Sequence, residues 1–133
     1  MTGVQTCALP ISPETLIIGN GDALDLKDAK EKAEKYGCDG VMLGRAIFGN
    51  PWLFTGKVPT IKEKLKVMVE HSKLFCELLP HKNFATMKKH YKAYCTGFPG
   101  AKELRIKLME SKDVGEVERI VDKFLRPVDN LLA

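Results

Sequence analysis

The sequence predicts a mixed fold in which an α/β part, a single βαβ unit, is followed by an all-α helical bundle. Two short apolar runs flank a helix-forming segment within residues 12–56, whereas residues 60–126 show only helical periodicity. The charge balance changes at the same place as the pattern. Residues 12–56 contain 5 basic and 7 acidic side chains, whereas residues 57–126 contain 16 basic and 9 acidic side chains. We therefore expect two parts of different architecture, with the positive charge in the second.

The first part has the pattern of strand, helix and strand. Thr15–Ile18 is a β-branched apolar run that stops at a glycine, and residues 40–43 form a second apolar run that does the same. Between them, residues 26–36 place apolar side chains at helical spacing, and Gly37 suits the left-handed end of a helix. Two buried parallel strands with a right-handed crossover are expected. Alone, such a unit would have open sheet edges and would aggregate.

The second part begins with a helix start signal. Thr60 and Glu63 form a capping box, and Pro80 is expected to end the helix that follows. Three further helices are expected at residues 82–95, at residues 101–111, and from Asp113 to just before Pro127. Helices joined by such short turns predict a small antiparallel bundle.

Length and composition exclude several classes of protein. The 133 residues are too few for a complete eight-fold β/α barrel, which needs about 250. No apolar run approaches the roughly 18–20 residues of a membrane span, and we expect no secretory signal, because no basic segment followed by an apolar run is found at the N-terminus. We expect a cytoplasmic protein with no membrane association, no metal site and free thiols, because no zinc pattern is formed by Cys7, Cys38, Cys76 and Cys95.

Glycine-bearing turns follow both predicted strands. Gly19–Asp22 follows the first and Gly44–Arg45 the second, and the carboxyl ends of parallel strands meet at one edge of a sheet. Glycine lets the backbone approach an anion closely, and a guanidinium matches phosphate oxygens. The pair of turns predicts a phosphate clamp. One alternative is that they are tight turns only, and another is that Asp22 is an N-cap for the next turn rather than a direct ligand.

Three segments, in order along the chain, resemble bacterial tRNA-dihydrouridine synthases, and the B type is the most similar subgroup. Residues 18–22 resemble the turn after the seventh strand of that family's barrel, and residues 37–54 resemble the end of the barrel. Residues 88–101, together with Leu104-Arg105, resemble the signature of the family's C-terminal helical domain. The resemblance covers about residues 14–126.

The resemblance implies a division into domains and a chemistry. Residues 13–56 would be the C-terminal βαβ portion of an FMN-binding TIM (β/α)8 barrel, and residues 57–133 a tRNA-binding helical domain. Enzymes of this family reduce uridine in tRNA to 5,6-dihydrouridine with FMN, and NADPH re-reduces the flavin. By their place in the motifs, the residues that would hold FMN are Asn20, Gly21 and Asp22 from one strand and Gly44 and Arg45 from the next.

The same resemblance implies what this chain lacks. The six preceding strands of the family's barrel, which carry the catalytic cysteine loop, have no counterpart in the sequence. We therefore expect no catalytic residue in this chain, no activity from it alone and at best weak FMN binding.

A basic helical face lies within the third of the resembling segments. Lys88, Lys89 and Lys92 fall on one side of a helix, and such a face predicts contacts with RNA phosphates. The alternative is an ordinary solvated lysine face. Arg105 is expected either to contact RNA or to pair with an acid of the bundle, such as Glu103 or Glu110.

The first residues of the chain have no structural pattern. Residues 1–12 contain no charged side chain, and residues 2–12 resemble a translated sequencing-library adapter. We expect residues 1–12 to be a non-native tail.

Two other functions stay open for the sequence. One is a non-catalytic RNA-binding module formed by the helical half. The other is a fragment of a different FMN- or phosphate-binding β/α-barrel enzyme.

Overall fold

The computed structural model describes the backbone of residues 13–131 and the side chains of residues 13–127. The predicted tail, residues 1–12, lies outside these. The described chain divides into two compact units. The strand unit comprises the residues up to Ile47 together with Pro51–Lys57, and the bundle comprises Phe48–Asn50 and the residues from Val58 onward.

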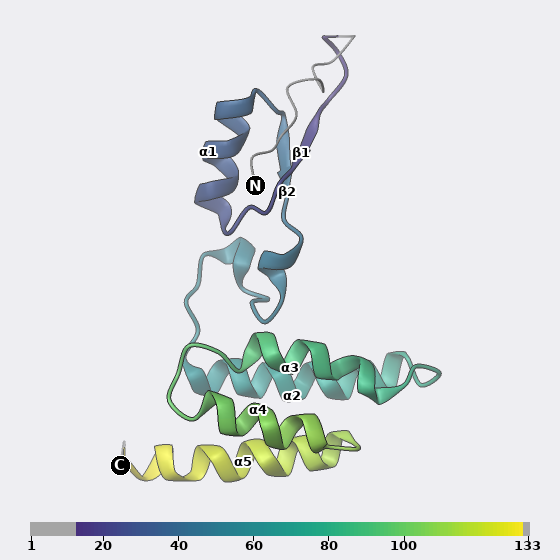
Figure 1. The fold of residues 1–133 in the computed structure, drawn as a ribbon, viewed down its shortest axis with the longest axis vertical. Coiled ribbons are helices and arrows are strands. Elements are labelled where there is room, and N and C mark those ends of the chain that lie inside the picture. The colour runs from purple at the N-terminus through teal and green to yellow at the C-terminus, as the bar shows by residue number, and fades with distance from the viewer. Residues whose placement is uncertain (1–12, 132–133) are drawn as a thin grey trace. The chain divides into compact units, whose positions relative to one another are not determined.

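The strand unit contains the βαβ arrangement that the sequence predicts. Strand β1 (Ile18–Asn20) is followed by helix α1 (Leu26–Tyr36) and strand β2 (Gly40–Met42). The two strands pair in parallel, with Ile18 opposite Gly40 and Asn20 opposite Met42 (Figure 1). The parallel pairing brings the ends of both strands to one edge of the sheet.

Helix α1 begins and ends where the sequence predicts. Asp25 caps its start by accepting a hydrogen bond from the Asp28 N–H at 2.8 Å. Gly37 ends it with φ +66°, a left-handed conformation that glycine adopts without strain. Asp22 is therefore not the N-cap of α1, because Asp25 performs that role.

The two strands differ from the prediction in position and burial. The first was expected over residues 15–18, but β1 begins at Ile18. Its register is set by Asp39, which accepts a hydrogen bond from the Ile17 N–H at 2.7 Å and donates one to the Ile17 carbonyl at 2.9 Å. Both strands were expected to be buried, yet Ile18 is 58% and Met42 56% exposed. A described sheet of two strands has too few neighbours to cover them.

The bundle consists of four α-helices that the sequence also predicts. Two short 3₁₀ turns belong to the strand unit, Arg45–Ile47 and Leu53–Thr55, and a third, Phe84–Met87, leads into α3 of the bundle. The α-helices are α2 (Ile61–Leu78), α3 (Lys88–Tyr94), α4 (Ala101–Glu110) and α5 (Val114–Leu131). In the bundle α2 packs against α3 and α5, and α4 packs against α3 and α5 (Figure 1).

One apolar core joins the four helices of the bundle. The capping box starts α2 as predicted, because Thr60 Oγ1 accepts from the Glu63 N–H at 3.2 Å and Glu63 Oε2 accepts from the Thr60 N–H at 2.8 Å. The core residues are all buried: Leu65, Met68, Val69, Met87, Tyr91, Tyr94, Cys95, Leu104, Leu108, Val117, Val121 and Leu125.

Two helix boundaries of the bundle correct the prediction. The segment expected as one helix from residue 82 to 95 is a 3₁₀ turn followed by a short α3. The last helix was expected to end before Pro127, but α5 continues to Leu131 with the proline inside it. Proline removes its own N–H and crowds the carbonyl four residues earlier, yet it does not end this helix. None of the described helices is long and apolar enough to cross a membrane.

Candidate functional site

The strand unit brings the two predicted glycine-bearing turns together. Arg45, three residues after β2, donates from Nε to Asp22 Oδ1 at 3.1 Å, and its Nη2 contacts the same oxygen. Asp22 lies two residues after β1, so this ion pair joins the two turns. Both side chains are solvent-exposed, at 80% for Arg45 and 59% for Asp22.

The pair leaves donors free to bind an anion. A guanidinium has five N–H groups, and the contacts with Asp22 use one on Nε and one on Nη2. The three others are in a suitable geometry for two oxygens of a phosphate. The hydrogen bond and charge of Arg45 lower the pKa of Asp22 below its usual value, which keeps the carboxylate ionised and Arg45 oriented.

Lys32 holds the first turn against α1. Its Nζ donates to the carbonyl oxygens of Gly21 and Asp22, both at 3.2 Å, and to Asp28 Oδ2 at 2.8 Å. The turn needs such support because Asp22 has φ +49°, which is rare for a residue other than glycine. Asp28 Oδ2 also accepts from the Leu24 N–H at 2.9 Å, and the Lys32 contact lowers the pKa of Asp28.

The sequence did not predict the role of Lys32 in supporting the turn after β1. The only local signal was its position four residues after Asp28 on a helix, a spacing that commonly forms an ion pair. Nothing in that spacing indicates contact with carbonyl groups ten and eleven residues earlier.

The other predicted cofactor residues lie beside this pair. Asn20 and Gly21 are exposed at the end of β1. A Cβ added to Gly44 would meet no atom within 4 Å, so a ligand can approach the backbone there. Arg45 and Lys32 balance the charges of Asp22 and Asp28, so an anion would be held by directed hydrogen bonds rather than by excess positive charge.

The predicted RNA-binding lysines differ in what they contact. Lys88 donates from Nζ to the Met109 carbonyl at 2.7 Å, near the C-terminal end of α4. Lys89 and Lys92 are exposed on α3. The phosphate-binding face that the sequence predicts therefore has two fully available cations and one already engaged with backbone.

Arg105 has a contact that the sequence did not predict. Its Nη1 donates to the Cys95 carbonyl at 3.4 Å, at the C-terminal end of α3, rather than to Glu103 or Glu110. A cation at this end of a helix is favourable, because the last carbonyls carry partial negative charge.

A cluster of rings within the bundle contains two histidines. The His71 and His90 rings lie 4.9 Å apart, His71 Nδ1 is 3.3 Å from Tyr94 Oη, and the Phe48 ring is 5.3 Å from His90. Burial lowers the pKa of both histidines, and the charges of His71 and Lys89 lower that of His90 further. Gly49 beside Phe48 approaches α3 closely, since an added Cβ would lie 2.5 Å from the Ala93 carbonyl carbon.

No cluster of metal-ligating side chains occurs in the part of the chain that the structure describes. Cys38, Cys76 and Cys95 are free thiols. Cys38 precedes β2, at the end opposite Arg45, and the other two belong to the bundle. Burial raises the pKa of Cys95 to about 11, so its thiol stays protonated.

The family model described as "Dihydrouridine synthase (Dus)" matches residues 8–129. A "Probable tRNA-dihydrouridine synthase" of Staphylococcus aureus (strain MRSA252) is 41% identical over 124 residues, which cover 90% of this chain and 38% of the relative. A protein of the same description from Staphylococcus epidermidis is 36% identical over 131 residues, covering 95% of this chain and 40% of the relative.

A "Probable tRNA-dihydrouridine synthase 2" of Bacillus subtilis (strain 168) is also similar, at 37% identity over 120 residues, 87% of this chain and 37% of the relative. The chain thus spans about two fifths of the length of these curated relatives.

Proposed function

This chain belongs to the dihydrouridine synthase family, and from that premise we propose that it supplies two parts of a tRNA-dihydrouridine synthase. Residues 13–56 would be the C-terminal βαβ portion of an FMN-binding TIM barrel. Residues 57–133 would be the helical domain that binds tRNA. The whole enzyme would reduce uridine in tRNA to 5,6-dihydrouridine, with NADPH as the source of electrons.

The observation that carries the flavin part is the Asp22–Arg45 pair, which links the turns after two neighbouring parallel strands. Arg45 would bind the FMN phosphate with its three remaining N–H groups, beside the open backbone of Gly44. Asn20, Gly21 and Asp22 would line the other side. Bound FMN supplies the hydride chemistry of this family, and these residues only hold and orient it.

We assign no catalytic residue to this chain. The described cysteines lie away from Arg45 or in the bundle, and Cys95 is a buried, protonated thiol. Two strand ends also give few contacts to a flavin. We therefore expect weak FMN binding and no reduction of tRNA uridines by the 133-residue chain with NADPH.

A flavin titration tests the phosphate contact. FMN and riboflavin differ only in the phosphate, so flavin fluorescence should report tighter binding of FMN to the wild-type chain. Arg45→Gln should weaken FMN binding by about tenfold, since a charge-assisted hydrogen bond is removed, and should leave riboflavin unaffected. Lys30→Gln, the same charge change on an exposed residue of α1, is the matched control. Equal FMN affinity of Arg45→Gln and the wild type would contradict the site.

RNA binding by the bundle is supported by a different observation, the exposed Lys89 and Lys92 on α3. Lys88 and Arg105 would add their remaining N–H donors nearby. Phosphate contacts make affinity fall as salt rises, so a double substitution of Lys89 and Lys92 to Gln should reduce both tRNA affinity and the slope of log K against log salt. A flat salt response of the wild type would contradict RNA binding. RNA binding with no flavin binding would favour the alternative of a non-catalytic RNA-binding module.

A further inference from the structure

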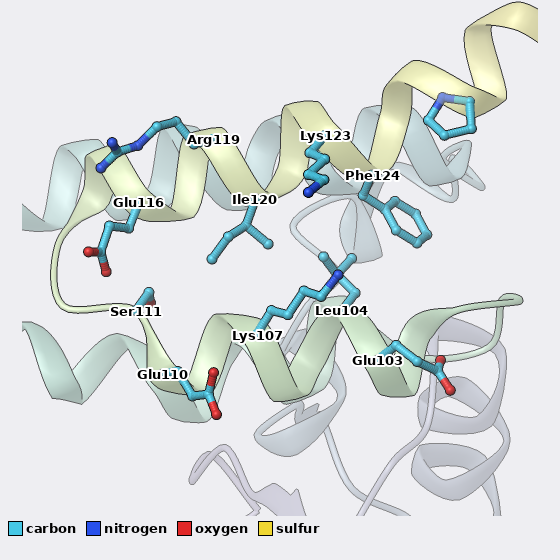
Figure 2. A pocket seen from close by; sticks show the side chains of 11 residues that line it. Glu103, Leu104, Lys107, Glu110, Ser111, Glu116, Arg119, Ile120, Lys123 and Phe124 are labelled. Carbon is cyan, nitrogen blue, oxygen red and sulfur yellow. The ribbon is translucent and has the colours of Figure 1, made fainter.

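Helix α4 has a hollow on each side, and the two differ in charge. The groove between α4 and α5 has an apolar floor and a charged rim in which three acids balance three bases (Figure 2). Its rim is formed by Glu103, Lys107, Glu110, Glu116, Arg119 and Lys123. The hollow on the other side, which we call the α4 hollow, has three cations and one carboxylate: Lys92, Lys102, Arg105 and Glu110, with Ile106 and Met109.

The floor of the α4 hollow is apolar and exposed. Ile106 is 54% and Met109 49% exposed, although α4 already turns Leu104 and Leu108 into the core of the bundle. The core therefore does not account for these two large apolar side chains. Their position beside three cations suits a ligand that carries both negative charge and a flat apolar surface.

We propose that the α4 hollow binds an unstacked nucleotide of a single-stranded RNA segment, an inference that rests on the proposed binding of tRNA by the bundle. The base lies against Ile106 and Met109, and the flanking phosphates lie on Lys92 and Lys102. Single-stranded RNA exposes base faces and phosphates together, whereas a duplex keeps its base faces stacked and would leave the apolar floor uncovered.

Arg105 and Glu110 together favour a base over a free phosphate at the centre of the hollow. Arg105 Nη1 donates to the Cys95 carbonyl, which leaves the other N–H groups and the face of the guanidinium for a ligand. A guanidinium plane stacks on bases as well as binding phosphate. Glu110 would repel a phosphate but accepts an N–H from a base edge, which places the base on its side of the hollow and the phosphates toward the lysines.

The test compares RNA forms across paired variants of the full 133-residue chain. Fluorescence anisotropy would measure affinity for a labelled octauridylate and for a labelled RNA duplex of mixed sequence over a salt series. Ile106→Gln combined with Met109→Gln removes the apolar floor and keeps strong helix formers. Leu74→Gln combined with Leu78→Gln is the matched control, because these side chains of α2 are also exposed, at 45% and 69%.

The floor variant should weaken octauridylate binding by about tenfold and leave duplex binding within about twofold, while the α2 control changes neither. For octauridylate, Lys102→Gln should reduce the magnitude of the slope of log K against log salt by about 0.7, which is the contribution of one phosphate contact to a single strand. Lys107→Gln, on the same helix but in the groove of Figure 2, should leave it unchanged.

Three results would overturn the inference, and they distinguish failure of the base site from failure of the proposed RNA function. The base site would be contradicted if the floor variant bound octauridylate as tightly as the wild type does. It would also be contradicted if the floor variant lost the same affinity for the duplex as for octauridylate. Either result would leave the proposed RNA binding by the bundle intact. Absence of salt-dependent binding of either RNA to the wild type removes the proposed RNA function and this inference together.

Discussion

The bundle and the strand unit differ in how completely each buries its apolar residues. Every residue of the main core cluster belongs to the bundle, and helices α2 to α5 all contribute to it. In the strand unit, α1 buries no residue fully, while large apolar side chains are exposed, among them Leu16 and Leu24 at 76% each. The bundle thus encloses a shared core, although it also exposes apolar side chains such as Ile106 and Met109, whereas the strand unit contributes no residue to that core.

This difference indicates which of the two units depends on additional strands or helices for its stability. A sheet of two short strands is marginal by itself, since it gains little from burial and leaves edges unpaired. The exposed apolar residues of the strand unit are where neighbouring strands of a larger sheet would pack, which supports the proposed barrel portion. The bundle needs no such neighbours, so its proposed RNA surface would persist when the strand unit is disturbed.

Of the tests of this comparison, a pair of leucine truncations has the largest expected effect. Leu65 is fully buried in the bundle, so Leu65→Ala should lower the free energy of unfolding by about 2–5 kcal/mol. Leu24→Ala should change it by less than about 0.5 kcal/mol, because Leu24 is 76% exposed in the strand unit. Urea unfolding followed by circular dichroism measures both. Similar losses for the two variants would break the comparison.

A pair of glycine substitutions sharpens the comparison between the bundle and the strand unit. Gly49 in the bundle and Gly56 in the strand unit have φ +70° and +68°, so alanine costs similar backbone strain at each. Only at Gly49 would the new Cβ overlap backbone, at 2.5 Å from Ala93. Gly49→Ala should therefore destabilise the chain by roughly 1–3 kcal/mol more than Gly56→Ala in the same unfolding assay. Equal effects would show that the close approach to α3 is not present in solution.

The histidine pair predicts a pH dependence confined to the bundle. His71 and His90 are held neutral, with pKa values below the ordinary value of about 6.5, and they face Tyr94 and the Phe48 ring with Lys89 nearby. The unfolded chain binds these protons more readily, so stability is present above the unfolded pKa and falls as pH drops below it.

The free energy of unfolding of the bundle should therefore decrease between pH 7.5 and pH 5. Replacing both His71 and His90 with Gln should flatten this decrease, whereas His81→Gln, on an exposed histidine, should not. A decrease of the same size in the double variant would assign the pH dependence to other groups.

The smallest expected effect concerns Lys32 in the strand unit. Lys32→Met removes the contacts to the Gly21 and Asp22 carbonyls, so the turn loosens and Arg45 loses its fixed partner. We expect a several-fold loss of FMN affinity and faster exchange of the Arg45 Nε–H in NMR, with little change in bundle stability. Lys30→Met should have neither effect, and Lys32→Arg should restore both. An unchanged Arg45 signal in Lys32→Met would contradict the role of Lys32.

Local sequence signals predicted the helices better than the strands. The range of α1, its glycine end and the Thr60–Glu63 capping box were predicted because each depends on residues within one or two turns. The start of β1 was not, because its register depends on Asp39, 22 residues away from Ile17. Pro127 failed as a stop signal because α5 continues through it to Leu131, although a proline inside a helix loses its own donor and crowds the carbonyl four residues earlier.

The candidate site divides in the same way. The meeting of the two glycine turns followed from the parallel strand order, and the structure has the Asp22–Arg45 pair there. Lys32 could not be predicted, because its contacts depend on how α1 folds back over the turn. The α4 hollow likewise joins Lys92 of α3 to residues of α4, a proximity that only packing of the bundle creates.

Amide hydrogen exchange on the intact chain tests the central difference most directly. If the bundle is closed and the strand unit incomplete, core amides of α2, α4 and α5 should exchange only through global unfolding, while amides of β1, α1 and β2 exchange far faster through local opening. Protection of the β1 and β2 amides equal to that of the bundle core would contradict the account.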